Sequence, residues 1–161
     1  EHGAKKAKDA VFMAHRSGFQ NISIDLMYDL PDQTEASWLY TLAQIPDLPI
    51  QHISLYNLTI EPHTSFYRRK NALHLPDEKL SLGFLHAAID AFARQGFIRY
   101  EISAFAKSGF ESKHNTGYWI GRPFLGFGPS AFSYWEKSRF RNVANLQRYA
   151  RDLRIGSLPI D

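Results

Sequence analysis

Three strand patterns alternate with helical patterns in this chain, and that order constrains the fold more than any other feature. Residues 21–27 alternate polar and apolar side chains before becoming apolar, and residues 51–60 and 97–105 have similar strand character. Helical periodicity covers residues 4–17 and the stretch that begins at residues 76–78. Strands separated by helices of this length predict parallel pairing with right-handed crossovers. The class is therefore α/β, either an open doubly wound sheet or part of a barrel.

The ends of the predicted helices carry recognisable signals. Gly18 and Gly96 follow the first and the clearest helix, where a left-handed C-terminal residue is expected. Asp32 and Glu35 stand three residues apart, which predicts a capping box for a helix over residues 34–44. A last helix is predicted over 145–155.

The composition of the sequence changes after residue 106. Five glycines and eight aromatic residues crowd together between Gly109 and Trp135, a density that fits neither a regular helix nor a linker. We expect this stretch to pack closely over something, whether a barrel rim or a flat ligand. Two domains are predicted, residues 1–108 with the strands and helices, and residues 109–161 as a glycine- and aromatic-rich extension with a helix.

Composition excludes several classes of protein. The 161 residues contain no cysteine, so neither disulfides nor a cysteine metal site is expected within them. The net charge of +3 is spread in short clusters, which are typical of solvated surface, so no nucleic-acid partner is predicted. No signal peptide and no membrane span is recognisable, and the default compartment is the cytoplasm.

Four polar positions are candidates for function, each with an ordinary structural alternative. Asp25 lies near the C-terminal end of a predicted strand, where it could bind a ribose hydroxyl or an ammonium group, or instead cap a helix or form an ion pair. Glu101 faces the same edge next to Arg99, with which it could simply pair. Glu61 follows the second strand and favours a loop-positioning role. His114 suggests an acid–base group, an axial haem ligand, or only a hydrogen-bonding residue.

A family resemblance covers nearly the whole chain. The segments that carry it, in family order, are residues 18–34 (GFQNISIDLMYDLPDQT), 52–56 (HISLY), 58–62 (LTIEP), 75–78 (LPDE), 100–103 (YEIS), 114–115 (HN), 118–119 (YW) and 125–131 (LGFGPSA). Together they resemble the radical S-adenosylmethionine (SAM) HemN/HemW family, and so many segments in one order are more specific than any single motif.

The resemblance implies the second half of an incomplete (β/α)6 barrel with parallel strands and crossover helices. It also implies SAM and a [4Fe–4S] cluster in the full-length parent, the cluster being held by a C-x-x-x-C-x-x-C loop that is absent from these residues. The family's glycine-rich SAM motif and its small C-terminal domain are absent as well. We therefore expect a piece of a longer protein that is inactive alone and has little affinity for SAM.

Residue by residue, the resemblance implies three cofactor-binding positions. Asp25 matches a family aspartate that contacts SAM, Thr59 matches a position whose backbone lies near SAM, and Phe132 matches another cofactor-proximal position, where many relatives have histidine. No catalytic residue and no metal ligand is assigned. Asp29 and Asp32 replace two family glycines in a turn, and because aspartate tolerates positive φ better than most residues, the turn should survive with some strain.

Two functions compete within the family. The favoured one is haem binding and delivery of the HemW type, with porphyrin or haem and acceptor haemoproteins as partners. The alternative is oxygen-independent coproporphyrinogen III oxidase, a radical SAM oxidoreductase of porphyrin biosynthesis that converts two propionates to vinyls. A third interpretation, an unrelated barrel enzyme with chance similarity, would predict no cysteine triad upstream of residue 1 in the full-length gene.

Overall fold

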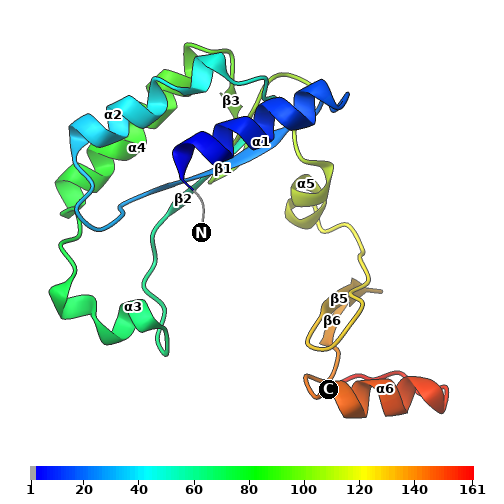
Figure 1. Ribbon diagram of the computed structural model, residues 1–161. Helices are drawn as coiled ribbons and strands as arrows, with labels where there is room; N and C mark the ends of the chain where they lie inside the picture. The colour runs from blue at the N-terminus through cyan, green and yellow to red at the C-terminus, as the bar shows by residue number, and fades with distance from the viewer. Residues whose placement is uncertain (1–2) are drawn as a thin grey trace. The chain divides into compact units, whose positions relative to one another are not determined.

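The structure, a computed structural model, describes residues 3–161 and divides the chain into two compact units, residues 1–111 and 112–161 (Figure 1). Each unit has its own secondary structure and is described by itself below. Among the described residues, no helix combines the length and the apolar character needed to cross a membrane.

The first unit is α/β, as predicted. Its elements are α1 (Ala4–Arg16), β1 (Ser23–Tyr28), α2 (Glu35–Leu42), η1 (Ile45–Asp47), β2 (His52–Asn57), α3 (Ser65–Arg68), η2 (Lys70–Ala72), α4 (Glu78–Ala93), β3 (Ile98–Arg99) and β4 (Ala104–Ala106). The strands form one four-stranded sheet in the order β1-β2-β4-β3. The sheet is open, and the barrel that the resemblance implies is not closed by these strands.

The prediction of an all-parallel sheet is wrong beyond β2. Strand β1 pairs with β2 in parallel, but β4 runs antiparallel to both β2 and β3. The predicted strand over 97–105 is in fact a short hairpin. Its turn is held by side chains, because the Glu101 carboxylate accepts hydrogen bonds from the backbone N–H and the hydroxyl of Ser103. The Arg99 guanidinium donates to the carbonyls of Glu101 and Ile102.

The core lies between one face of the sheet and the helices. Strand β1 turns alternate residues, Ile24, Leu26 and Tyr28, toward the apolar cluster. Helices α2 and α4 pack side by side (Figure 1), and the buried Trp38 indole donates to the Phe84 carbonyl at 2.8 Å. A buried indole N–H needs such a partner, so this bond fixes the position of α2 on α4.

The capping box of α2 differs from the predicted one. Thr34 is the N-cap, its hydroxyl accepts from the backbone N–H of Ser37, and the Ser37 hydroxyl accepts in return from Thr34. Asp32 instead lies in the preceding turn with φ 58°. Helix α4 begins after Asp77, whose carboxylate accepts from the Leu80 N–H at 2.8 Å.

Both aspartates that replace family glycines adopt left-handed backbone conformations, as predicted, with φ 61° at Asp29 and 58° at Asp32. Their side chains fasten the loop after β1 to the region where α4 begins. The buried Asp29 carboxylate accepts from the Ser81 hydroxyl at 2.6 Å and from the Asn57 amide. The Asp32 carboxylate lies 3.2 Å from Nδ1 of His74. These contacts offset the strain of positive φ at residues with a Cβ.

The second unit contains α5 (Lys113–Trp119), β5 (Phe132–Trp135), β6 (Ser138–Arg141) and α6 (Leu146–Arg154). Strands β5 and β6 form an antiparallel hairpin whose two turn residues, Glu136 and Lys137, both have positive φ. Of these elements, only α6 matches a predicted helix. Turns of this kind usually contain asparagine, aspartate or glycine, and their absence here explains why the hairpin was not predicted.

The glycine- and aromatic-rich segment packs on this hairpin. The backbone N–H of Gly126 donates to the Ser133 hydroxyl at 3.0 Å, and the buried Asn142 amide donates to the carbonyls of Gly126 and Gly128 at 3.1 and 3.0 Å. A Cβ on Gly126 would lie 2.9 Å from the Ala131 Cβ and closer still to the carbonyl oxygen of Phe132. Glycine is therefore required there by the close approach of two backbone segments.

Candidate functional site

The sheet of the first unit has a polar face opposite its apolar core. Ser23 and Asp25 alternate with the core residues of β1, and the register pairs them with His52 and Ser54 of β2. Because paired residues share a face, these four side chains lie together. Asp25 is exposed, whereas His52 and Ser54 are buried. The arrangement offers an exposed carboxylate beside hydroxyl and imidazole groups, which suits a ligand hydroxyl or ammonium.

His52 links three segments of the chain on this face. Its Nδ1 lies 2.8 Å from the Ser23 hydroxyl and its Nε2 lies 2.8 Å from the Tyr100 hydroxyl. Each hydroxyl can donate or accept, so a neutral imidazole satisfies both contacts in either tautomer. The ring also meets Tyr100 edge to face at 5.7 Å. His52 thereby connects β1, β2 and the turn after β3.

Burial lowers the pKa of His52 below its ordinary value of 6.5, and the carboxylates of Asp25 and Glu101 oppose that shift without overcoming it. Desolvation disfavours the imidazolium form more than the two carboxylates favour it. The imidazole is therefore neutral at pH 7, and its two hydrogen bonds position the neighbouring hydroxyl groups.

The three cofactor positions implied by the resemblance fall in different places. Asp25 lies within β1, and Thr59 is exposed two residues beyond the end of the neighbouring β2. Phe132 begins β5 in the second unit, where the Arg139 guanidinium carbon lies 4.7 Å from its ring centroid. Asp25 thus lies in β1 and Thr59 in the connection after the adjacent β2, whereas Phe132 belongs to a separate unit.

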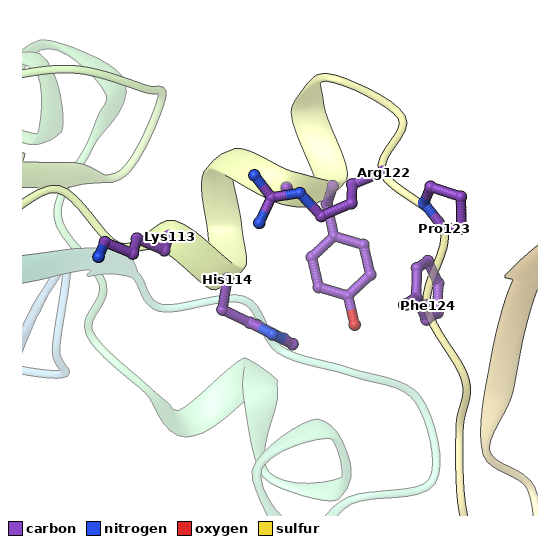
Figure 2. Close-up of a pocket in the computed structure, with 7 residues that line it drawn as sticks. Lys113, His114, Arg122, Pro123 and Phe124 are labelled. Carbon is purple, nitrogen blue, oxygen red and sulfur yellow. The ribbon is translucent and has the colours of Figure 1, made fainter.

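The second unit has a pocket of its own beside α5 (Figure 2). Its cavity of about 200 Å³ is lined by Lys113, His114, Gly117, Tyr118, Arg122, Pro123 and Phe124. The His114 ring meets Tyr118 edge to face at 4.8 Å, and Tyr118 meets Phe124 at 4.5 Å. The three rings pack edge to face in a row, and aromatic side chains in such a row offer apolar surface to a ligand. A cavity of this size encloses part of a large ligand and leaves the rest in solvent.

The nitrogen atoms of His114 are available to a ligand. The side chain is exposed, and among the hydrogen bonds of residues 3–161 none involves a ring nitrogen of His114. A neutral imidazole with a free lone pair is a common ligand of haem iron.

Sequence reasoning singled out His114 but missed the residues around it. Arg122 and Phe124 join the pocket because the chain reverses after α5, where the Arg122 N–H donates to the Gly117 carbonyl at 2.8 Å and Gly121 has φ 66°. His52 was missed as well, although a histidine within a buried strand is a usable signal. The contacts of His52 join segments that are far apart in the sequence, whereas Arg122 and Phe124 reach the pocket through a local reversal of the chain.

Comparison with known proteins relates the chain to one family. No family model matches it. The chain is 34% identical over 152 residues to the heme chaperone HemW of Lactococcus lactis, and 37% identical over 150 residues to that of Bacillus subtilis. These alignments cover 93% and 92% of this chain but 40% of each relative. The chain is a homologue of the HemW/HemN radical SAM proteins.

A solved structure of the HemW/HemN family has the same fold. The coproporphyrinogen III oxidase HemN from Escherichia coli, described as a radical SAM enzyme, matches 99% of this chain with a TM-score of 0.77 at 21% identity. The match covers 40% of that enzyme. At this identity the likeness establishes the fold, and the predicted relation to part of a HemN structure is confirmed, with a mixed and open sheet in place of the predicted parallel barrel strands.

The cofactors of the radical SAM family fit this chain unequally. The chain contains no cysteine, so its residues do not fit a [4Fe–4S] cluster. The polar face fits SAM better, because Asp25 presents an exposed carboxylate beside Ser54, and a carboxylate binds ribose hydroxyls or an ammonium group. With a [4Fe–4S] cluster of the full-length parent as the electron source, bound SAM would supply the radical chemistry, and these residues would only bind and orient SAM.

Proposed function

We propose that this chain is the haem-binding part of a HemW-like haem-handling protein, with His114 as the iron ligand. The observation that carries the proposal is the α5 pocket, where the exposed His114 imidazole packs edge to face in a row with two aromatic rings. Relatives that share 34–37% identity with the chain are heme chaperones. A transport role also suits an open pocket, because a partly exposed haem can be released to an acceptor.

Titration with ferric haem tests this proposal. The chain should shift and sharpen the Soret band, and His114→Ala should remove the shift because the iron loses its protein ligand. His86→Ala is the matched control, since His86 is exposed on α4 in the first unit. Equal spectra for His114→Ala and the unaltered chain would refute the assignment of the ligand.

The polar face favours a second candidate, a part in a radical SAM oxidase acting on coproporphyrinogen III. Asp25 in β1 and Thr59 in the connection after β2 would then contact SAM, as the family resemblance implies. The test is decarboxylation of coproporphyrinogen III by the full-length parent, reconstituted anaerobically with iron and sulfide. Product that disappears in Asp25→Ala would support the oxidase, whereas no product together with haem retention would favour the haem-handling role.

A further inference from the structure

The second unit has an uneven distribution of charge. Residues 112–161 contain eight lysines and arginines but three aspartates and glutamates, although the whole chain has a net charge of only +3. Excess positive charge gathered in one compact unit attracts an anionic partner. The positions of the three acidic residues show which arginines form ion pairs within the unit and are therefore less available to an anionic partner.

Two of the three acidic residues pair with arginines at the C-terminal side of the unit. Asp152 lies 2.9 Å from the Arg151 guanidinium, and Asp161 lies 2.6 Å from that of Arg141. Arg148 approaches both carboxylates, at 3.5 and 3.8 Å. The third acidic residue is in the turn of the β5–β6 hairpin.

The two cations at the α5 pocket have no such partner. Within residues 3–161, neither Lys113 nor Arg122 forms an ion pair, and both side chains are exposed. The Arg122 side chain folds back along α5 over Gly117 (Figure 2). The Gly117 position explains this course, because an added Cβ there would already be in van der Waals contact with Arg122 Cδ at 3.6 Å. A bulkier side chain at 117 would push the guanidinium away from the pocket.

We propose that Arg122, assisted by Lys113, binds the carboxylates of a tetrapyrrole whose ring lies against His114, Tyr118 and Phe124. This inference rests on the proposed function and adds its specificity, since the pocket would select carboxylated porphyrins over neutral ones. A guanidinium donates two parallel hydrogen bonds to a carboxylate, and a lysine adds a second positive charge. The pocket thus presents apolar rings to the flat part of the ligand and cations to its acidic edge.

The test compares protoporphyrin IX, which has two carboxylates and no metal, with its dimethyl ester. Quenching of tryptophan fluorescence in the chain gives both affinities, and the absence of iron removes any contribution from ligation by His114. The unaltered chain should bind the diacid more tightly, and Arg122→Gln should weaken diacid binding by about threefold to fivefold, the range for an exposed ion pair. Binding of the diester should not change.

Arg154→Gln is the matched control, because it removes the same charge from an exposed position at the end of α6, outside the pocket lining. The proposal is overturned if diacid and diester bind equally, if neither binds, or if Arg122→Gln and Arg154→Gln weaken the diacid alike. A haem spectrum that depends on His114 while the diacid shows no preference would retain the proposed function and reject the carboxylate site. Tighter binding of the diacid together with a haem spectrum that does not depend on His114 would retain the carboxylate site and reject His114 as the iron ligand.

Discussion

Alanine at Gly126 should open the segment that packs on the β5–β6 hairpin. The new Cβ would lie 2.9 Å from the Ala131 Cβ, and closer to the Phe132 carbonyl oxygen, whereas carbon atoms pack best at about 3.5 Å or more. Relief of the first contact alone needs a movement of about 0.6 Å. Such a movement stretches the 3.0 Å bond from Gly126 to Ser133 and the 3.1 Å bond from Asn142 beyond hydrogen-bonding range.

The expected cost follows from these two effects. Overpacking costs about 1–3 kcal/mol, and each lost hydrogen bond about 1 kcal/mol. Together, Gly126→Ala should lower the free energy of local opening by about 3 to 5 kcal/mol. Gly126 does not have positive φ, so none of this cost comes from backbone strain.

Two other glycines provide controls that separate the mechanisms. Gly121 has φ 66° with no atom within 4 Å of an added Cβ, so Gly121→Ala should cost only the strain of about 1–2 kcal/mol. Gly83 lies within α4 with similar space, and alanine there should stabilise the helix by up to about 1 kcal/mol.

Hydrogen exchange measured by mass spectrometry on the full chain reports each region separately. Peptides covering residues 124–143 should lose protection in Gly126→Ala, while those from α4 keep it. If Gly126→Ala cost no more than Gly121→Ala, the steric argument would be wrong.

Three further predictions concern the first unit. Because burial lowers the pKa of His52 below 6.5, the unfolded state takes up a proton at this site before the folded state does as the pH falls. The contribution of His52 to stability against urea should therefore be constant above pH 6.5 and decline below it, a decline that His52→Gln should reduce and His86→Gln should not. Trp38→Phe should lower the urea-derived free energy of unfolding by about 1–3 kcal/mol, because it removes the hydrogen bond to the Phe84 carbonyl and leaves space in the core. An unchanged free energy of unfolding would contradict the packing of α2 on α4. Asp77→Ala should cost about 1 kcal/mol through loss of the α4 cap, and Asp77→Asn, which keeps an acceptor, should cost less in the same assay.

The sequence predicted those elements whose local pattern matches their environment. Strand β1 alternates because one of its faces is buried, and α4 has a continuous apolar stripe between Asp77 and Gly96. The hairpin of β3 and β4 was not predicted, because its turn depends on bonds from Glu101 and Arg99 to neighbouring main-chain groups. Such local side-chain bonds compete with strand pairing and leave little trace in hydropathy.

For the candidate sites, single residues were predictable from the sequence, but the side chains around them were not. Asp25 was singled out by its place in a predicted strand, and His114 by its residue type. The cations and rings around His114 did not, because Arg122 and Phe124 reach the pocket only through the chain reversal after α5. The network of His52 needed the register of β1 on β2 and the turn after β3.

The amide of Asn142 also determines the order in which the second unit can be completed during synthesis. Gly126 and Gly128 receive their donor from a residue that leaves the ribosome well after them. Until β6 has emerged and paired with β5, both carbonyls depend on water, and the segment that brings Phe124 to Tyr134 has no fixed course. The pairing of Phe124 with Tyr134 is therefore completed late on the growing chain, once Asn142 has reached the two carbonyls.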